Sequence, residues 1–308
     1  MALPSGCLVI TILLTFFYQP LATAVTYNVV NLGAKPDGKT DSTKSFLSAW
    51  DAACASANPT IIYVPPGRYL LHKANFYGER CKNTAITIRI DGTLVAPSDY
   101  RTIGNGGSWL ILEKVSGVSI FGGTLDDQGT GLWACKASGK ACPTGATVYT
   151  VLYNSNDIVI NGLTSLNSQM FHIAINGCHN VKVQGVKVSA SGNSPNTDGI
   201  HIQLSSGVTI SNSRIATGDD CVSIGPGSSN LWIENAFVAP PWDQNSGVLI
   251  SDVTYQDIHG TSATAVAVKF DCSKKYGCEG IRLEDIKLTF RNQPAEASCV
   301  NVRGSTCL

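Results

Sequence analysis

The chain is poor in charge and carries no excess of either sign. Lys and Arg together number 22, Asp and Glu together number 22, and charged residues are 14% of 308. No basic run suggests a nucleic-acid partner, and no acidic tail suggests a solvating segment. A neutral chain exerts little long-range attraction on a polyanion, so binding one must depend on local Lys and Arg side chains.

Long apolar runs are also missing. The stretch Leu8–Phe17 is apolar, and Ala22-Thr23-Ala24 after it has the small-x-small form of a leader cleavage site. The run is shorter than the ~20 apolar residues that span a bilayer, and no later stretch approaches that length. We therefore expect a signal peptide over 1–24, a secreted mature protein and no membrane partner; a membrane anchor is the alternative.

Cysteine pairs with zinc-type spacing are absent as well, so the sequence predicts no metal and no cofactor. Eleven cysteines occur, of which Cys7 lies in the expected leader. Ten cysteines in a secreted chain indicate disulfides. The local candidates are Cys54 with Cys81, Cys135 with Cys142, Cys272 with Cys278, and Cys299 with Cys307, which leaves Cys178 and Cys221.

Helical patterns are scarce after residue 55. One earlier helix is expected, with Asp41 or Ser42 as its cap. The residues on its apolar face are Phe46, Leu47, Trp50 and Cys54. The rest of the chain consists of short β segments separated by Gly and Asn.

The β segments recur at a near-constant spacing. The apolar-x-apolar triplets are Ile158-Val159-Ile160, Val181-Lys182-Val183, Val208-Thr209-Ile210 and Leu231-Trp232-Ile233. A fixed period of roughly 20–50 residues indicates stacked repeats, and repeats made only of strands predict a β-solenoid. The early helix would then cap one end and cover an open sheet edge. A β-sandwich is the alternative, but it predicts hairpins instead of this period.

The period is interrupted once in the sequence. The next apolar triplet, Val248-Leu249-Ile250, follows Leu231 too soon to keep the spacing of the earlier triplets. The intervening segment shows no alternation, and Pro240-Pro241 cannot continue a central strand. Either a short coil or a lost block of repeats would produce this pattern.

Two acidic motifs have the spacing of the repeat. Asn196-Thr197-Asp198 and Gly218-Asp219-Asp220 correspond position by position, one period apart. Stacked parallel strands lie ~4.8 Å apart, so these carboxylates would form one cluster on adjacent coils. Like charges at that distance resist joint ionisation, which supplies an acid and a base for glycosidic cleavage. Turn caps or a calcium site are the alternative interpretation.

The orientation of these side chains is less simple to predict. Strict alternation places Asp198 in phase with the inward-facing Ile200, and burying an unpaired carboxylate is costly. We therefore expect a bend at Gly199 and Cys221 that turns the carboxylates outward. His201 and Ser223 are also in register, and we assign His201 to the floor of a substrate cleft.

The sequence resembles the plant polygalacturonases of glycoside hydrolase family 28, most of all the pollen-type, exo-acting branch. The resemblance runs from Tyr27 to about Asn235 and resumes at Gly247. Its most specific motifs are the two acidic ones, which match the first two of the family's four signature blocks.

The resemblance implies an all-β fold, a single-stranded right-handed parallel β-helix over 25–308 with an N-terminal capping helix. It implies inverting hydrolysis of α-1,4 bonds in polygalacturonate by a secreted, cell-wall protein, expected to be a monomer. Asp219 would protonate the leaving oxygen, Asp198 and Asp220 would activate water, and Asn196 would help to form a substrate subsite.

The chain also departs from the family pattern. The family's next two blocks, Gly-His-Gly and Arg-Ile-Lys, are absent. The irregular spacing and the missing motifs both point to a deletion junction at 236–246, which would also have removed the family's disulfide partner of Cys221. Three hypotheses follow: an active polygalacturonase, an impaired pectin-binding remnant or incompletely assembled sequence, and a calcium-dependent pectate lyase.

Overall fold

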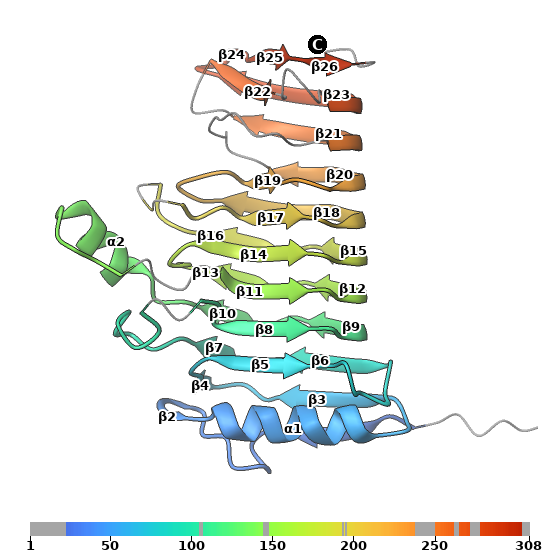
Figure 1. Ribbon diagram of the computed structural model, residues 1–308. Coiled ribbons are helices and arrows are strands. Elements are labelled where there is room, and N and C mark those ends of the chain that lie inside the picture. The colour runs from blue at the N-terminus through green and yellow to red at the C-terminus, as the bar shows by residue number, and fades with distance from the viewer. Residues whose placement is uncertain are drawn as a thin grey trace, which may run out of the picture.

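The computed structural model describes residues 23–104, 107–143, 148–192, 194, 196–237, 250–261, 265–271 and 278–303. These residues form an all-β, right-handed parallel β-helix, which confirms the predicted fold class (Figure 1). Most of the expected leader, residues 1–22, lies outside the described residues. Among the residues that the structure describes, no helix is both long and apolar enough to cross a membrane.

Three ladders of parallel strands form the faces of the solenoid. The longest, ladder 1, stacks β1 (Val25–Asn28), β3 (Thr60–Val64), β6 (Ile86–Ile90), β9 (Ser116–Phe121), β12 (Asn156–Asn161), β15 (His179–Gln184), β18 (Ser206–Ala216), β20 (Ser229–Phe237), β21 (Ile250–Thr261), β23 (Cys278–Phe290) and β26 (Val302–Arg303).

The other two ladders are shorter. Ladder 2 stacks β2 (Asp37–Asp41), β4 (Arg68–Leu70), β7 (Thr93–Val95), β10 (Thr124–Asp126), β13 (Thr164–Leu166) and β16 (Lys187–Ser189), and continues into the second half of β18, which pairs with the end of β20. Ladder 3 stacks β5 (Ala74–Tyr77), β8 (Leu110–Glu113), β11 (Val148–Tyr153), β14 (Phe171–Asn176), β17 (Ile200–Gln203) and β19 (Val222–Ile224).

The remaining strands lie near the C-terminal end. There β22 (Val266–Asp271) pairs in parallel with β25 (Glu296–Val300), and β24 (Gln293–Pro294) pairs antiparallel with β23.

The predicted repeats stack as expected. In ladder 1, Ile158 pairs with Val181, Val181 with Val208, and Val208 with Leu231. All four side chains are buried and belong to one continuous core. Each coil thus covers the apolar residues of its neighbours, which is how a repeat too small to fold alone becomes stable.

The predicted interruption of the period is wrong within the described residues. Leu231 pairs with Val253 and Ile233 with Tyr255, so the next coil follows at the ordinary spacing. The triplet Val248-Leu249-Ile250 is not the equivalent of Leu231, because the buried Val253 occupies that register position. The proposed junction at 236–246 lies outside the described residues from position 238 onward.

The expected N-terminal helix is α1 (Thr43–Ala55), which lies across the first coil (Figure 1). Asp41 caps it, since its Oδ1 accepts from the Thr43 N–H at 2.9 Å, whereas Ser42 makes no side-chain cap bond. Phe46 and Trp50 are buried against the core. The helix therefore covers the end of the solenoid, as predicted.

A second helix, α2 (Thr130–Ala137), was not expected from the sequence. It leaves the solenoid after β10 and buries Leu132 and Trp133. The indole N–H of Trp133 donates to the Ser168 carbonyl at 3.1 Å, on the following coil. Two buried residues in eight give too weak a helical pattern to detect, so this helix depends on its tertiary contacts.

The disulfides follow the predicted pairing where both partners are described. Cys54 is bonded to Cys81, and Cys135 to Cys142. Cys278 and Cys299 are also disulfide-bonded, but their predicted partners, at positions 272 and 307, lie outside the described residues.

Candidate active site

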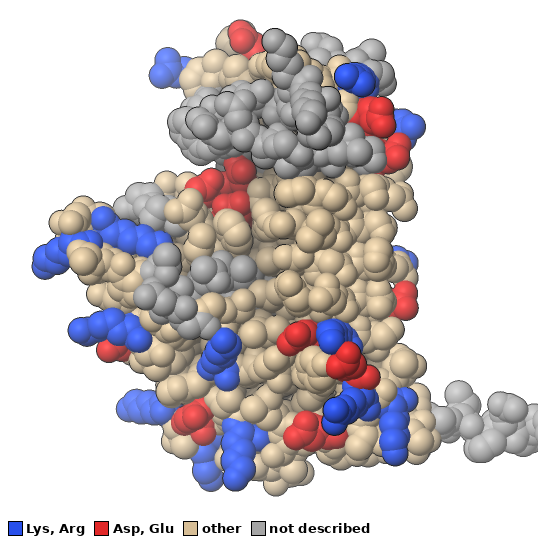
Figure 2. Space-filling view, viewed as in Figure 1, with Lys and Arg blue, Asp and Glu red and all other residues tan. Residues whose placement is uncertain are grey.

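The two acidic motifs lie in the turns that precede β17 and β19 of ladder 3. Ile200 pairs with Val222, so equivalent positions of the two motifs lie on consecutive coils. The N–H of Gly199 donates to the Asp220 carbonyl at 2.7 Å, so the register extends into the turns. Figure 2 shows acidic side chains gathered on one face at the level of β19. The predicted stacking of the motifs is therefore present.

Two glycines allow these turns to lie in direct contact. A Cβ on Gly199 would lie 2.6 Å from the Cys221 carbonyl oxygen. A Cβ on Gly218 would lie 2.3 Å from the Ser194 carbonyl oxygen. Any side chain at either position would push the two coils apart and separate the carboxylates that they carry.

Asp198 is buried, with 7% of its surface exposed, which corrects the expectation that it turns outward. Ser223, on the next coil, donates a hydrogen bond from Oγ to Asp198 Oδ2 at 2.5 Å. Burial raises the pKa of the Asp198 carboxyl, the Ser223 hydrogen bond opposes that rise, and the charge of Asp219 adds to it. The cost of an inward carboxylate is thus met by a partner that strand alternation alone does not reveal.

Asp219 and Asp220 are only partly buried. The two carboxylate oxygens of Asp219 accept from the backbone N–H groups of Asn196, at 3.1 Å, and Asp220, at 2.9 Å. Asn196 therefore contacts Asp219 through its main chain, with φ of 56°, and its own side chain is exposed. Burial and the nearby charge of Asp220 raise the pKa of Tyr255, on β21 of the following coil.

His201 lies on β17 beside this cluster and is half-buried. Its Nδ1 lies 2.8 Å from Ser223 Oγ, and its Nε2 lies 3.3 Å from Gln203 Oε1. The Phe171 ring, on the preceding coil, stacks against the imidazole at 4.9 Å between centroids. Phe171, Gln203 and Tyr255 belong to no motif that would mark them in the sequence, and the strand register places all three.

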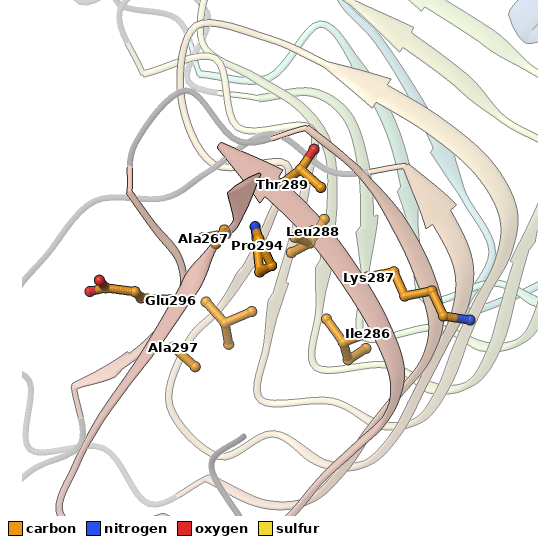
Figure 3. A pocket seen from close by; sticks show the side chains of 10 residues that line it. Ala267, Ile286, Lys287, Leu288, Thr289, Pro294, Glu296 and Ala297 are labelled. Atoms are coloured by element: carbon orange, nitrogen blue, oxygen red, sulfur yellow. The ribbon is translucent and has the colours of Figure 1, made fainter. Parts of the chain in front are cut away.

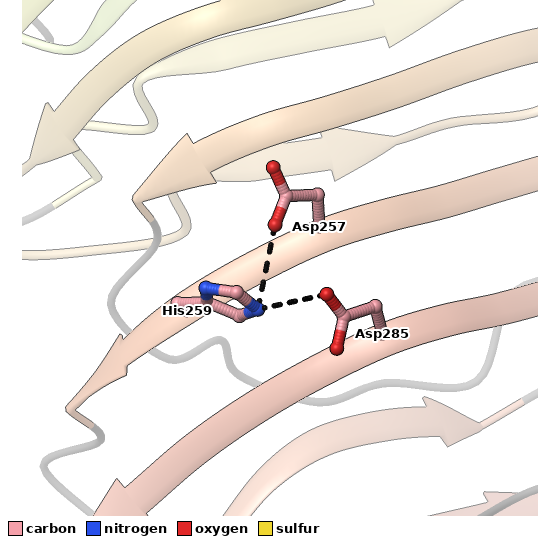
Figure 4. Close-up of side chains that lie close together, drawn as sticks. All are labelled: Asp257, His259 and Asp285. Carbon is pink, nitrogen blue, oxygen red and sulfur yellow. Dashed lines mark ion pairs between the residues drawn. The ribbon is translucent and has the colours of Figure 1, made fainter.

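A separate group of side chains has the spacing of metal ligands. Among the described residues, Asp257, His259 and Asp285 place ligand atoms within 4.8 Å of one another, and all three are exposed (Figure 4). His259 Nε2 lies 3.4 Å from Asp257 and 3.3 Å from Asp285, whose other oxygen lies 2.6 Å from Lys287 Nζ. These contacts make a surface ion-pair network, and they give His259 the partners that the sequence did not reveal.

A pocket of about 420 Å³ lies in the last coils, between β22, β23 and β25 (Figure 3). It is lined mainly by apolar side chains such as Ile286, Leu288 and Pro294, with Lys287 and Glu296 as its charged members. It shares no residue with the carboxylate cluster, so the two features are distinct.

The family model, the related sequences and the solved structures all point to the same group of proteins. The model of glycosyl hydrolases family 28 matches residues 54–241 and 238–308. A polygalacturonase of Prunus persica is 52% identical over 364 aligned positions, which take in 93% of this chain and 92% of the relative. An exopolygalacturonase of Zea mays is 30% identical, over 91% of this chain and 88% of the relative.

The solved structures add the fold. The crystal structure of an endo-xylogalacturonan hydrolase from Aspergillus tubingensis matches with a TM-score of 0.65 and 18% identity, over 93% of this chain and 99% of that one. The family model and the two plant relatives each cover most of the sequence, and the chain therefore belongs to glycosyl hydrolase family 28, together with the polygalacturonases.

Proposed function

We propose that this chain is a secreted hydrolase of the cell wall that cleaves α-1,4 bonds between galacturonic acid units of pectate. The observation that carries the proposal is the gathering of Asp198, Asp219 and Asp220 on two consecutive coils. Its plant relatives are named polygalacturonase and exopolygalacturonase, which supports pectate as substrate and an exo mode of attack.

The geometry supports a division of labour among the carboxyls. Inverting hydrolysis needs one carboxylic acid at the leaving oxygen and one carboxylate that activates a water, and the two carboxyl groups lie ~6.5–9.5 Å apart to leave room for that water. In this proposal Asp219, which is partly exposed, protonates the leaving oxygen. Asp198, which lies deeper, acts with Asp220 on the water. Asn196 is exposed at the rim of the cluster, where it would contribute to a sugar subsite.

Release of reducing sugars from polygalacturonate by the purified protein tests this proposal. Asp219→Asn should lower the rate by roughly 10²- to 10⁴-fold, the usual contribution of a general acid. Asp91→Asn is the control, because that exposed carboxyl lies beyond β6 on ladder 1 and pairs with Arg89. Equal rates for the two variants would show that Asp219 is not the general acid. Ultraviolet-absorbing products that disappear with a chelator would instead identify a lyase.

A second candidate function, an impaired pectin-binding remnant, is favoured by two specific observations. The 364 positions aligned with the Prunus persica relative outnumber the 308 residues of this chain, so part of that alignment has no counterpart here. The family model also matches in two segments that meet at 238–241. Both support a block missing near the proposed junction, where the Gly-His-Gly and Arg-Ile-Lys motifs would belong.

The transcript separates these candidates. Sequencing across codons 235–247 should reproduce the present junction if the shortened chain is real. An intact block of coils there would show the sequence to be incomplete and would restore the first proposal in full. With the junction confirmed, pectate binding without sugar release would establish the remnant.

A further inference from the structure

A chain of hydrogen bonds leads from the most deeply buried carboxyl of the site to a histidine ring. Ser223 Oγ donates to Asp198 Oδ2 at 2.5 Å, and His201 Nδ1 lies 2.8 Å from the same Ser223 oxygen. Asp198 and Ser223 come from adjacent coils, and His201 pairs with Ser223 across β17 and β19. The imidazole is thus linked to the carboxyl through a single hydroxyl group.

The positions of the protons along this series of hydrogen bonds follow from the number of hydrogens that each side chain can donate. An ionised Asp198 only accepts, so the one hydroxyl hydrogen of Ser223 is then directed to Asp198 and His201 Nδ1 donates to Ser223 Oγ. Gln203 presents its amide oxygen to His201 Nε2 at 3.3 Å, and in that arrangement Nε2 donates as well. An imidazole that donates from both nitrogens is the positively charged imidazolium.

The surroundings of the ring suit a positive charge. Phe171, from β14, stacks on the imidazole at an interplanar angle of 16°, and an aromatic face attracts a cation. The ionisable groups in the turns before β17 and β19 are Asp198, Asp219 and Asp220, all of them acidic. The positive charge of His201 acts to lower the pKa of Asp198, against burial and against Asp219.

We propose that His201, as an imidazolium, acts through Ser223 to keep the buried Asp198 carboxyl ionised, and is therefore a positioning residue for that carboxylate. This role differs from the substrate contact that the sequence predicts for His201. A water-activating carboxylate must be ionised, and burial opposes ionisation. The link to water activation rests on the proposed function, whereas the coupling between His201 and Asp198 does not.

Titration of Asp198 by nuclear magnetic resonance tests the coupling directly. The protein would carry ¹³C-labelled aspartate, and Asp198→Asn would assign the signal. A cation within about 4–6 Å commonly lowers a carboxyl pKa by 1–3 units, so His201→Gln should raise the pKa of Asp198 by about one unit. Asp198 should respond in the same direction to Ser223→Ala.

The chain offers a matched control in a second histidine–serine pair. His179 Nδ1 lies 2.7 Å from Ser206 Oγ on ladder 1, and this pair is exposed. His179→Gln should leave the Asp198 titration unchanged. An unchanged Asp198 pKa in His201→Gln, or an equal rise in His179→Gln, would overturn the proposal.

A second measurement on the unaltered protein guards against a variant that fails to fold. ¹⁵N chemical shifts of His201 should show both ring nitrogens protonated at a pH where Asp198 is ionised, and one bare nitrogen there would contradict the proposal. Neither measurement needs turnover, so an inactive protein leaves this test intact. In an active preparation, His201→Gln should also move the acid limb of the pH–rate profile to higher pH by the same amount.

Discussion

Asp127 offers a sharp test of how an inward-facing carboxyl affects the stability of this solenoid. It directly follows β10, is 0% exposed, and neither of its carboxyl oxygens has a hydrogen-bond partner. Burial raises its pKa well above the usual value, and the charge of Asp126 adds to the rise. Because an unpaired buried charge is very costly, we expect Asp127 to be protonated in the folded protein at mildly acidic pH.

The pH dependence of stability follows from proton binding. Between the unfolded pKa, near 4, and the higher folded pKa, the folded chain holds a proton that the unfolded chain has lost. The contribution of Asp127 is therefore fully present below the unfolded pKa and is lost as pH rises through the folded pKa. The free energy of unfolding should fall by about 1.4 kcal/mol per pH unit across this window because of this one group.

Asp127→Asn keeps the shape of the side chain and removes its titration. Relative to the natural protein, the variant should become more stable by about 1.4 kcal/mol for each pH unit above about pH 4. Urea unfolding at a series of pH values measures the difference. Asp91→Asn is the control: hydrogen bonds from Arg89 lower the pKa of Asp91, so its effect should be constant across this window. A constant difference for Asp127→Asn as well would refute the reasoning.

Two further predictions concern the packing of the coils. Replacing Cys54 and Cys81 by Ala should lower the free energy of unfolding by about 3.5 kcal/mol, because this disulfide closes a loop of 27 residues. At that bond, reduction of the natural protein should cause no loss of stability beyond the loss in the variant. Gly199→Ala should cost about 1–3 kcal/mol in chemical unfolding and reduce sugar release by an active preparation, since the new Cβ would collide with the Cys221 carbonyl; an unchanged unfolding midpoint would contradict the close contact.

The fold was predictable because the solenoid repeats one local rule. Ile158, Val181 and Val208 share an apolar-x-apolar form and a near-constant spacing, and the stacked register makes all three buried. The same rule fails after Leu231, where it predicts Val248 as the next equivalent position. Two overlapping apolar patterns compete there, and only pairing across the ladder selects Val253.

The sequence predicted which carboxylates form the site, but not the contacts that their side chains make. Spacing alone placed Asp198 above Asp220, and the backbone hydrogen bond between Gly199 and Asp220 bears this out. Asp198 was predicted to turn outward, but it is buried. The prediction was wrong because the partner that stabilises the buried carboxylate, Ser223, is 25 residues away in the sequence. A side chain that compensates for burial from another coil gives no signal in the local sequence.

Stacking also explains how a solenoid can lose part of its cleft without losing its fold. Ser206 pairs with Ser229, and Ser229 pairs with Ser251, so the coil that crosses the proposed junction is about as long as the coil before it. Each coil contacts only its neighbours, and removal of whole coils therefore joins two compatible surfaces. A catalytic cleft has no such tolerance, because its groups come from particular coils. On the proposal that coils are missing, the shortened solenoid should still fold, and binding and turnover of pectate are the measurements that would reveal the lost part of the cleft.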